Sequence, residues 1–131
     1  MSLTAKLDSY RPQALAVLRI ASSLFFLQHG LAKLIRFPYV EQLANVPLFS
    51  QFGIGGIIEV TGSLLILVGF YTRAAAFIVS GLAAVAYFQF HAPSNFFPIL
   101  NGGELVALFS FVFFYLIFAG PGAWSLDGRR G

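Results

Sequence analysis

The chain has 131 residues, of which 58% are hydrophobic, 10% are charged and 16 are Phe, and its mean hydropathy is +0.82. An ordinary soluble domain carries about 25% charged residues, and a soluble fold of this size cannot bury so much apolar surface. The composition therefore excludes a soluble globular domain and a disordered chain, and indicates a membrane protein surrounded by lipid. The net charge of +3 does not predict nucleic-acid binding, because the basic residues are spread between apolar segments.

Four apolar segments predict an all-α membrane protein, a bundle of four transmembrane helices that forms one domain over residues 1–131. The segments are continuous and do not alternate, which favours helices over an outer-membrane barrel. Four spans of about 20 residues use ~80 residues and leave no room for a separate soluble domain. The predicted spans cover residues 13–35, 52–70, 74–90 and 105–119.

The first span is preceded by Lys6 and Arg11, as the apolar part of a signal peptide would be. However, Arg19 lies within this segment and no A-x-A-type cleavage site follows it, so we expect a permanent span. Residues 37–51 contain Pro38 and Pro47 and are unsuited to crossing the bilayer. We expect them to lie along the outer membrane interface between the first two spans.

The distribution of Lys and Arg predicts that both termini are cytoplasmic, in the inner membrane of a bacterium. Five basic residues flank the spans on one side: Lys6, Arg11, Arg73, Arg129 and Arg130. On the other side Arg36 is offset by Glu41, and residues 92–101 carry no Lys or Arg.

Polar residues of the first span gather on one face of a helical wheel, which we expect to face the interior of the bundle. These residues are Arg19, Ser22, Ser23, His29, Gly30 and Lys33, and Gln28 falls on the opposite face. The second span presents a face of small residues around one carboxylate: Gly55, Gly56, Glu59, Gly62 and Ser63. Small residues let two helices approach closely in a membrane.

Depth along the spans predicts a buried polar cluster in the outer half of the bundle. Its members are His29, Lys33, Glu59, His91, Asn101 and Glu104. Such groups are costly inside a membrane and often mark a functional site. Arg19 is a second buried charge nearer the cytoplasmic side, where Asp127 or backbone carbonyls would satisfy it.

Three interpretations of the outer cluster stay open. One is a pocket for a quinone head group, in which His29, Lys33 or Glu104 exchange protons beside Phe side chains. Another is a buried charge network that only holds the helices in register, a reading we weight somewhat higher. The third, a haem held by His29 and His91, is less favoured because no partner that would orient the ligating His is evident. The absence of Cys excludes thiolate ligands, and no metal site is predicted.

Four sequence motifs make the chain resemble the DoxX family of small four-helix bacterial membrane proteins. They are the stretch from Arg19 that ends in HGLAK at 29–33, EVTGSLLILVGFYTR at 59–73, NGGE at 101–104 and GPGAWSLD at 120–127. The resemblance implies a cytoplasmic-membrane protein. Some members of the family are associated with thiosulfate:quinone oxidoreduction, and others form complexes with soluble redox enzymes.

The leading hypothesis is therefore a membrane subunit that supports redox chemistry and is associated with quinone. The alternative is a non-enzymatic scaffold that recruits or stabilises a partner protein, with residues 37–51 as an apolar docking surface. The sequence leaves open whether the protein is an enzyme, which cofactor it binds, and whether it pairs with another protein or with a second copy.

Overall fold

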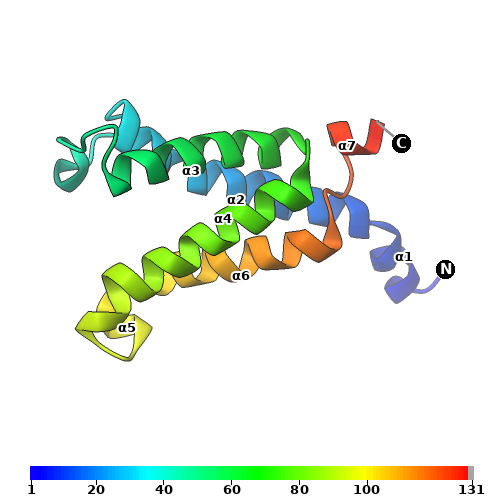
Figure 1. The fold of residues 1–131 in the computed structure, drawn as a ribbon. Coiled ribbons are helices and arrows are strands. Elements are labelled where there is room, and N and C mark those ends of the chain that lie inside the picture. Colours follow the sequence, from blue (N-terminus) through cyan, green and yellow to red (C-terminus); the bar gives the residue numbers. More distant parts are fainter. Residues whose placement is uncertain (130–131) are drawn as a thin grey trace.

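The computed structural model describes residues 1–129, and this part of the chain consists of helices joined by turns (Figure 1). The helices are α1 (Leu3–Ser9), α2 (Arg11–Leu34), α3 (Gln51–Val68), α4 (Thr72–Ala86), α5 (Pro98–Asn101), α6 (Glu104–Ala119) and α7 (Leu126–Arg129). Shorter turns are the 3-10 helices η1 (Glu41–Leu43) and η3 (Ala92–Ser94), and the π-helical turn η2 (Tyr87–His91). Arg130, which the charge count placed beside Arg129, lies outside the described residues.

Each of the four predicted apolar segments is helical, so the all-α prediction is confirmed. By length and composition, three helical stretches are able to cross a membrane: α2, α3 and the run Thr72–Ser94, which extends α4 through η2 and η3. Helix α6 is equally apolar but has 16 residues.

The four long helices associate as two pairs. Helix α2 packs against α3, and α4 packs against α6. Figure 1 shows the two pairs close together at the end that carries α7 and diverging toward the end that carries α5. The divergence leaves room between the pairs for a cavity at the α5 end.

Glycines set the close approach of α2 to α3. A Cβ atom on Gly30 would lie 2.9 Å from the carbonyl oxygen of Gly56 and 2.7 Å from a methyl carbon of Val60. A side chain at this position would therefore push the helices apart. The small-residue face predicted for the second span is buried as expected: Gly55, Gly56, Glu59, Gly62 and Ser63.

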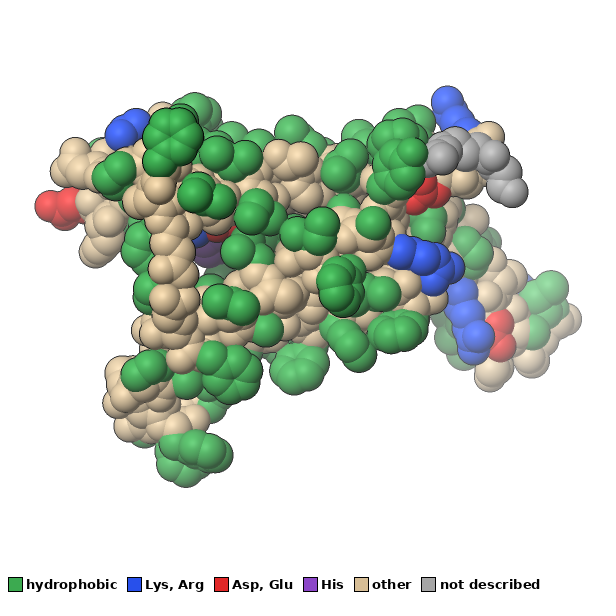
Figure 2. Space-filling view, viewed as in Figure 1, with side chains coloured by type: hydrophobic (Ala, Val, Ile, Leu, Met, Phe, Trp, Pro, Cys, Tyr) green, Lys and Arg blue, Asp and Glu red, His purple; other side chains and the backbone are tan. Residues whose placement is uncertain are grey.

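Aromatic rings fill the middle of the bundle between the two pairs. The ring of Phe26 on α2 makes edge contacts with Phe109 and Phe113 on α6, with 5.1 Å between centroids in both cases. Other hydrophobic side chains cover the sides of the molecule, whereas most of the visible charged side chains lie toward its ends (Figure 2). This pattern suits a bundle whose sides face lipid.

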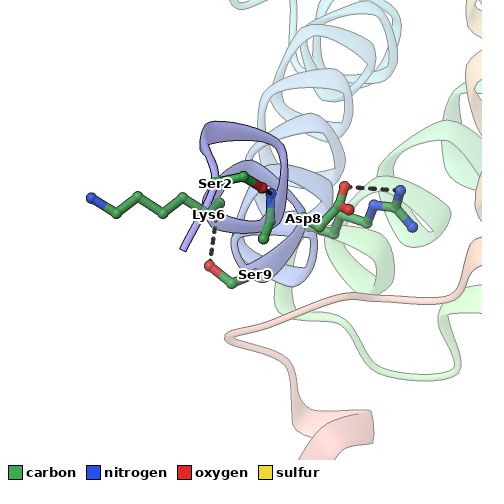
Figure 3. Close-up of polar contacts among 6 residues, drawn as sticks. Ser2, Lys6, Asp8 and Ser9 are labelled. Carbon is green, nitrogen blue, oxygen red and sulfur yellow. Dashed lines mark hydrogen bonds and ion pairs between the residues drawn. The ribbon is translucent and has the colours of Figure 1, made fainter.

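Helix α1 forms a short exposed lead before α2. The Ser2 hydroxyl caps it by accepting a hydrogen bond from the backbone N–H of Ala5 at 3.1 Å, and the Ser9 hydroxyl donates to the carbonyl of Lys6 at 2.6 Å (Figure 3). Asp8 pairs with Arg11 at 3.0 Å across the junction of α1 and α2. These local contacts end α1 and start α2.

Residues 120–127 form a segment, here called the C-terminal clasp, that wraps around the buried side chain of Arg19. The guanidinium donates hydrogen bonds to the carbonyls of Pro121, Ala123 and Trp124, at 2.9 Å for Ala123 and 2.8 Å for Trp124. Of the two kinds of partner expected for Arg19, backbone carbonyls therefore make the hydrogen bonds. The carboxylate of Asp127 accepts from the backbone N–H groups of Tyr71, just before α4, and of Thr72, its first residue.

Candidate functional site

A cavity of about 380 Å³ lies between the two helix pairs at the α5 end. Figure 2 shows histidine and charged side-chain atoms inside a hollow between the pairs. Four of the six predicted cluster residues line the cavity: His29, Lys33, Glu59 and His91. The walls between them are mainly aromatic and aliphatic, and include Phe26, Phe52, Leu82, Phe90, Leu105, Val106 and Phe109.

Lys33 and Glu59 form an ion pair in the cavity wall. The ammonium of Lys33 on α2 donates a hydrogen bond to Oε1 of Glu59 on α3, and the two side chains are 16% and 5% exposed. The ammonium also lies 5.6 Å from the ring centroid of Phe52, within the range of a cation–π contact. Each charge therefore has a partner, and the pair presents one anionic and one cationic group to the cavity.

His29 contributes a polar atom without a partner. Its Nε2 atom is buried and has no hydrogen-bond partner in the part of the chain that is described. The ring is packed against aromatic neighbours, with centroids 6.2 Å from Phe26 and 5.8 Å from Phe109. Because a buried polar atom without a hydrogen bond costs about 1–3 kcal/mol, a ligand that bonds to Nε2 would recover free energy.

The π-helical turn η2 ends at His91 and brings it to the cavity. Nδ1 of His91 lies 3.0 Å from the backbone carbonyl oxygen of Asn101, which only accepts hydrogen bonds. Nδ1 must therefore carry a hydrogen, and in the neutral imidazole Nε2 is then an acceptor. The ring of Tyr87, one turn earlier, stacks on His91 with 6.4 Å between centroids.

Asn101 lies behind His91 and orders the loop between α4 and α6. Its side-chain amide donates to the hydroxyl of Tyr87 and to the carbonyl of Asn95, both at 3.0 Å, and accepts from the N–H of Gly103 at 2.8 Å. The side chain is buried but is not part of the cavity wall. Asn101 thus positions His91 and does not face the cavity itself.

Glu104 departs from the expectation of a buried cluster. It is exposed at the first residue of α6 and does not line the cavity. The depth of a residue along a span was predicted, but depth does not determine which way a side chain points around its helix. A carboxylate in the first turn also interacts favourably with the positive end of the helix dipole without being buried.

Two contacts that the sequence did not reveal join α3 to η2 beside the cavity. The rings of Phe52 and Phe90 lie 4.8 Å apart, and the side-chain amides of Gln51 and Gln89 hydrogen bond to each other at 2.6 and 3.2 Å. No local pattern identifies these pairs, because they depend on how the two helices are placed. Within residues 1–129, no group of three His, Asp or Glu residues comes together to hold a metal ion.

Comparison with known proteins agrees with the helical membrane architecture. Residues 14–92 match the family model of DoxX, which is well over half of the chain. The chain belongs to the DoxX family. Its relatives in this family include proteins named as membrane proteins, and no solved structure gives a significant match.

Three DoxX-like relatives align over most of their length. An uncharacterized protein of Haemophilus influenzae is 43% identical, over 94% of this chain and 95% of the relative. Two inner membrane proteins of Escherichia coli, YphA and YqjF, are 31% and 32% identical. The alignment with YphA covers 91% of each protein, and the alignment with YqjF covers 85% of this chain and 87% of YqjF.

Proposed function

We propose that this DoxX-family chain is a multi-pass protein of the bacterial inner membrane, with α2, α3, α4 and α6 as four spans. The two Escherichia coli relatives are named inner membrane proteins, which supports the location. A helix of 16 residues is about 24 Å long, and α6 packs against α4. Residues 37–51 then lie along the outer interface, and both termini are cytoplasmic because the basic residues flank that side.

The function that the cavity supports best is the binding of a quinone ring, by which the protein acts as the membrane subunit of a redox system. The observation that carries this proposal is the buried Nε2 atom of His29, which lacks a partner and sits among the aromatic side chains of the cavity. Sites for small molecules are typically apolar cavities of about 300–1,000 Å³ with a few convergent polar groups. The volume and lining of this cavity match that description.

The proposal is tested by purifying the protein gently from its native membrane and analysing the solvent extract by mass spectrometry. A quinone that is bound stoichiometrically and lost in the variant His29→Phe supports the proposal. The matched control is Gln28→Leu, which changes the neighbouring residue on the opposite, exposed face of α2. Equal quinone content in wild-type and His29→Phe protein would rule out this cavity as the quinone site.

A second candidate function, a scaffold for a partner protein, is favoured by the exposed aromatic side chains in the loops. These are Phe37, Tyr39, Phe49, Phe96 and Phe97, which are 58–87% exposed. A scaffold would retain its partner when the cavity is filled by His29→Phe and would lose it when Phe49 and Phe96 are replaced by Ser. Pull-down from the native membrane with both variants separates the two functions.

A further inference from the structure

We propose that the cavity selects the reduced, dihydroxy form of its ring ligand, a quinol or a catechol, over the oxidised quinone. This inference rests on the proposed function and specifies its ligand further. It follows from the hydrogen-bonding capacity of the polar atoms that line the cavity.

The first of these atoms is Nε2 of His91. The Asn101 carbonyl takes the hydrogen on Nδ1, so the neutral ring offers a lone pair at Nε2. The carbonyl has little freedom to move away, because the Asn101 side chain is tied to Tyr87, Asn95 and Gly103. No hydrogen bond to Nε2 is found within residues 1–129, and His91 lines the cavity, so we infer that this lone pair is open to a ligand.

The second polar wall is the ion pair of Lys33 and Glu59. The ionised carboxylate only accepts hydrogen bonds, and one hydrogen of the ammonium is already donated to it. A quinone oxygen is also only an acceptor, so it is mismatched with Nε2 of His91 and with Glu59. It can be satisfied only by Lys33 or by a hydrogen on Nε2 of His29.

A hydroxyl group both donates and accepts, and therefore matches each of these atoms. One hydroxyl of the ring can donate to Nε2 of His91, and the other can donate to Glu59 or accept from Lys33. His29 pairs with a hydroxyl in either of its tautomers, but with a quinone oxygen only when Nε2 carries the hydrogen. The quinol thus leaves fewer polar atoms of the cavity residues without a partner than the quinone does.

The test measures the binding of three probes to the full-length protein in detergent under argon: a decyl-substituted benzoquinone, its quinol, and the dimethyl ether of that quinol. The ether keeps both oxygens of the quinol without a hydrogen to donate but is larger by two methyl groups, whereas the quinone has nearly the size of the quinol. We expect the quinol to bind at least about fivefold more tightly than the quinone or the ether, since one unmatched polar group costs this much or more. Equal affinities for quinol and ether would overturn the inference.

The variant His91→Gln tests whether the preference for the quinol depends on His91 or only on the presence of a cavity. A glutamine amide can either donate or accept, so the preference for the quinol should fall to within about twofold. The matched control is Gln89→Leu, in the same turn η2 but outside the cavity wall, which should keep the preference. Should His91→Gln not accumulate, the ether measured with wild-type protein still decides the question.

The remaining outcomes separate this inference from the proposed function. Tighter binding of the quinone than of the quinol would overturn the selectivity and leave the quinone site standing. Failure of all three probes to bind would overturn both.

Discussion

Lys33 and Glu59 hold their ion pair next to Gly30 and Gly56, where α2 and α3 approach each other closely. A Cβ atom built on Gly56 would lie 3.1 Å from Cβ of Lys33, so the two helices bring the charges together with little room to spare. The pair therefore has both a structural and an electrostatic role: it joins two helices and shapes one wall of the cavity.

Removing one member of this pair should be more harmful than removing both. The single variants Lys33→Met and Glu59→Leu each leave a buried charge without a partner and should destabilise the protein by about 3–5 kcal/mol. The double variant should recover most of this loss. Unfolding in mixed micelles measures the difference, with Arg11→Ala, which breaks a solvent-exposed pair with Asp8, as a control expected to change stability by at most ~1 kcal/mol. A double variant that loses as much stability as the two single variants together would contradict the prediction.

Adding a methyl group at the crossing of α2 and α3 should separate these helices. Gly30→Ala places a carbon 2.9 Å from a backbone oxygen of α3, so we expect a loss of about 1–3 kcal/mol. Gly81→Ala is the matched control, because that Cβ would meet nothing within 4 Å and Ala favours the helix. Melting temperatures in the same detergent should fall for Gly30→Ala and stay equal or rise for Gly81→Ala. Equal melting temperatures for the two variants would show that the crossing tolerates a side chain.

Replacing Arg19 by Lys should loosen the C-terminal clasp. A single ammonium cannot reach all three carbonyls that the planar guanidinium contacts. A hydrogen bond to a charged group is worth about 1.5–3 kcal/mol, so the loss should be at least ~2 kcal/mol. Hydrogen exchange should speed up at Ala123, whose N–H donates to the carbonyl of Pro12 at 2.9 Å. Arg73→Lys, at an exposed arginine bound to the end of α6, should leave this amide protected.

Filling the space at His29 should cost no stability although it abolishes ligand binding. His29→Phe removes a buried nitrogen that has no partner, and it adds an aromatic ring beside Phe26 and Phe109. We expect the free energy of unfolding to be unchanged or higher by about 1 kcal/mol. Denaturation of the ligand-free variant checks this expectation. A loss of several kcal/mol would mean that His29 serves the fold and not a ligand.

The proposed orientation can be tested with single cysteines, because the natural chain has none. Ser94→Cys, at the α5 end, should react with a membrane-impermeant maleimide added to spheroplasts. Ser9→Cys, at the other end of the bundle, should react only after the membrane is broken. Both serines are exposed, so a difference in labelling reports the side of the membrane. The reverse pattern would place the termini outside.

Much of the fold, and four of the six residues of the predicted cluster, could be placed from the sequence because charged groups in apolar segments leave few alternatives. Arg19, Ser22, Ser23 and Gly30 on the predicted interior face are buried, while Gln28 on the opposite face is exposed. The position of His29, Lys33 and Glu59 around one cavity follows from the same reasoning. The free-energy cost of placing polar groups in lipid is large enough here that the sequence alone predicts which face of α2 is buried.

The remaining features depend on local geometry for which the sequence carries no signal. The π-helical turn η2 adds one residue to a turn and so changes the direction of Phe90 and His91, yet YFQFH does not differ from an ordinary apolar helix end. The tautomer of His91 depends on a backbone carbonyl ten residues later. Glu104 shows the same limit, because its exposure is decided by where α6 begins and how it is turned.

The clasp around Arg19 also has a consequence for the order of synthesis. The carbonyls that bind this arginine come 102 to 105 residues after it in the chain. A ribosome therefore synthesises α2, which carries Arg19, long before these carbonyls exist. The clasp can form only after the last of the long helices has been synthesised, so an incomplete chain lacks these hydrogen-bond partners for the Arg19 charge.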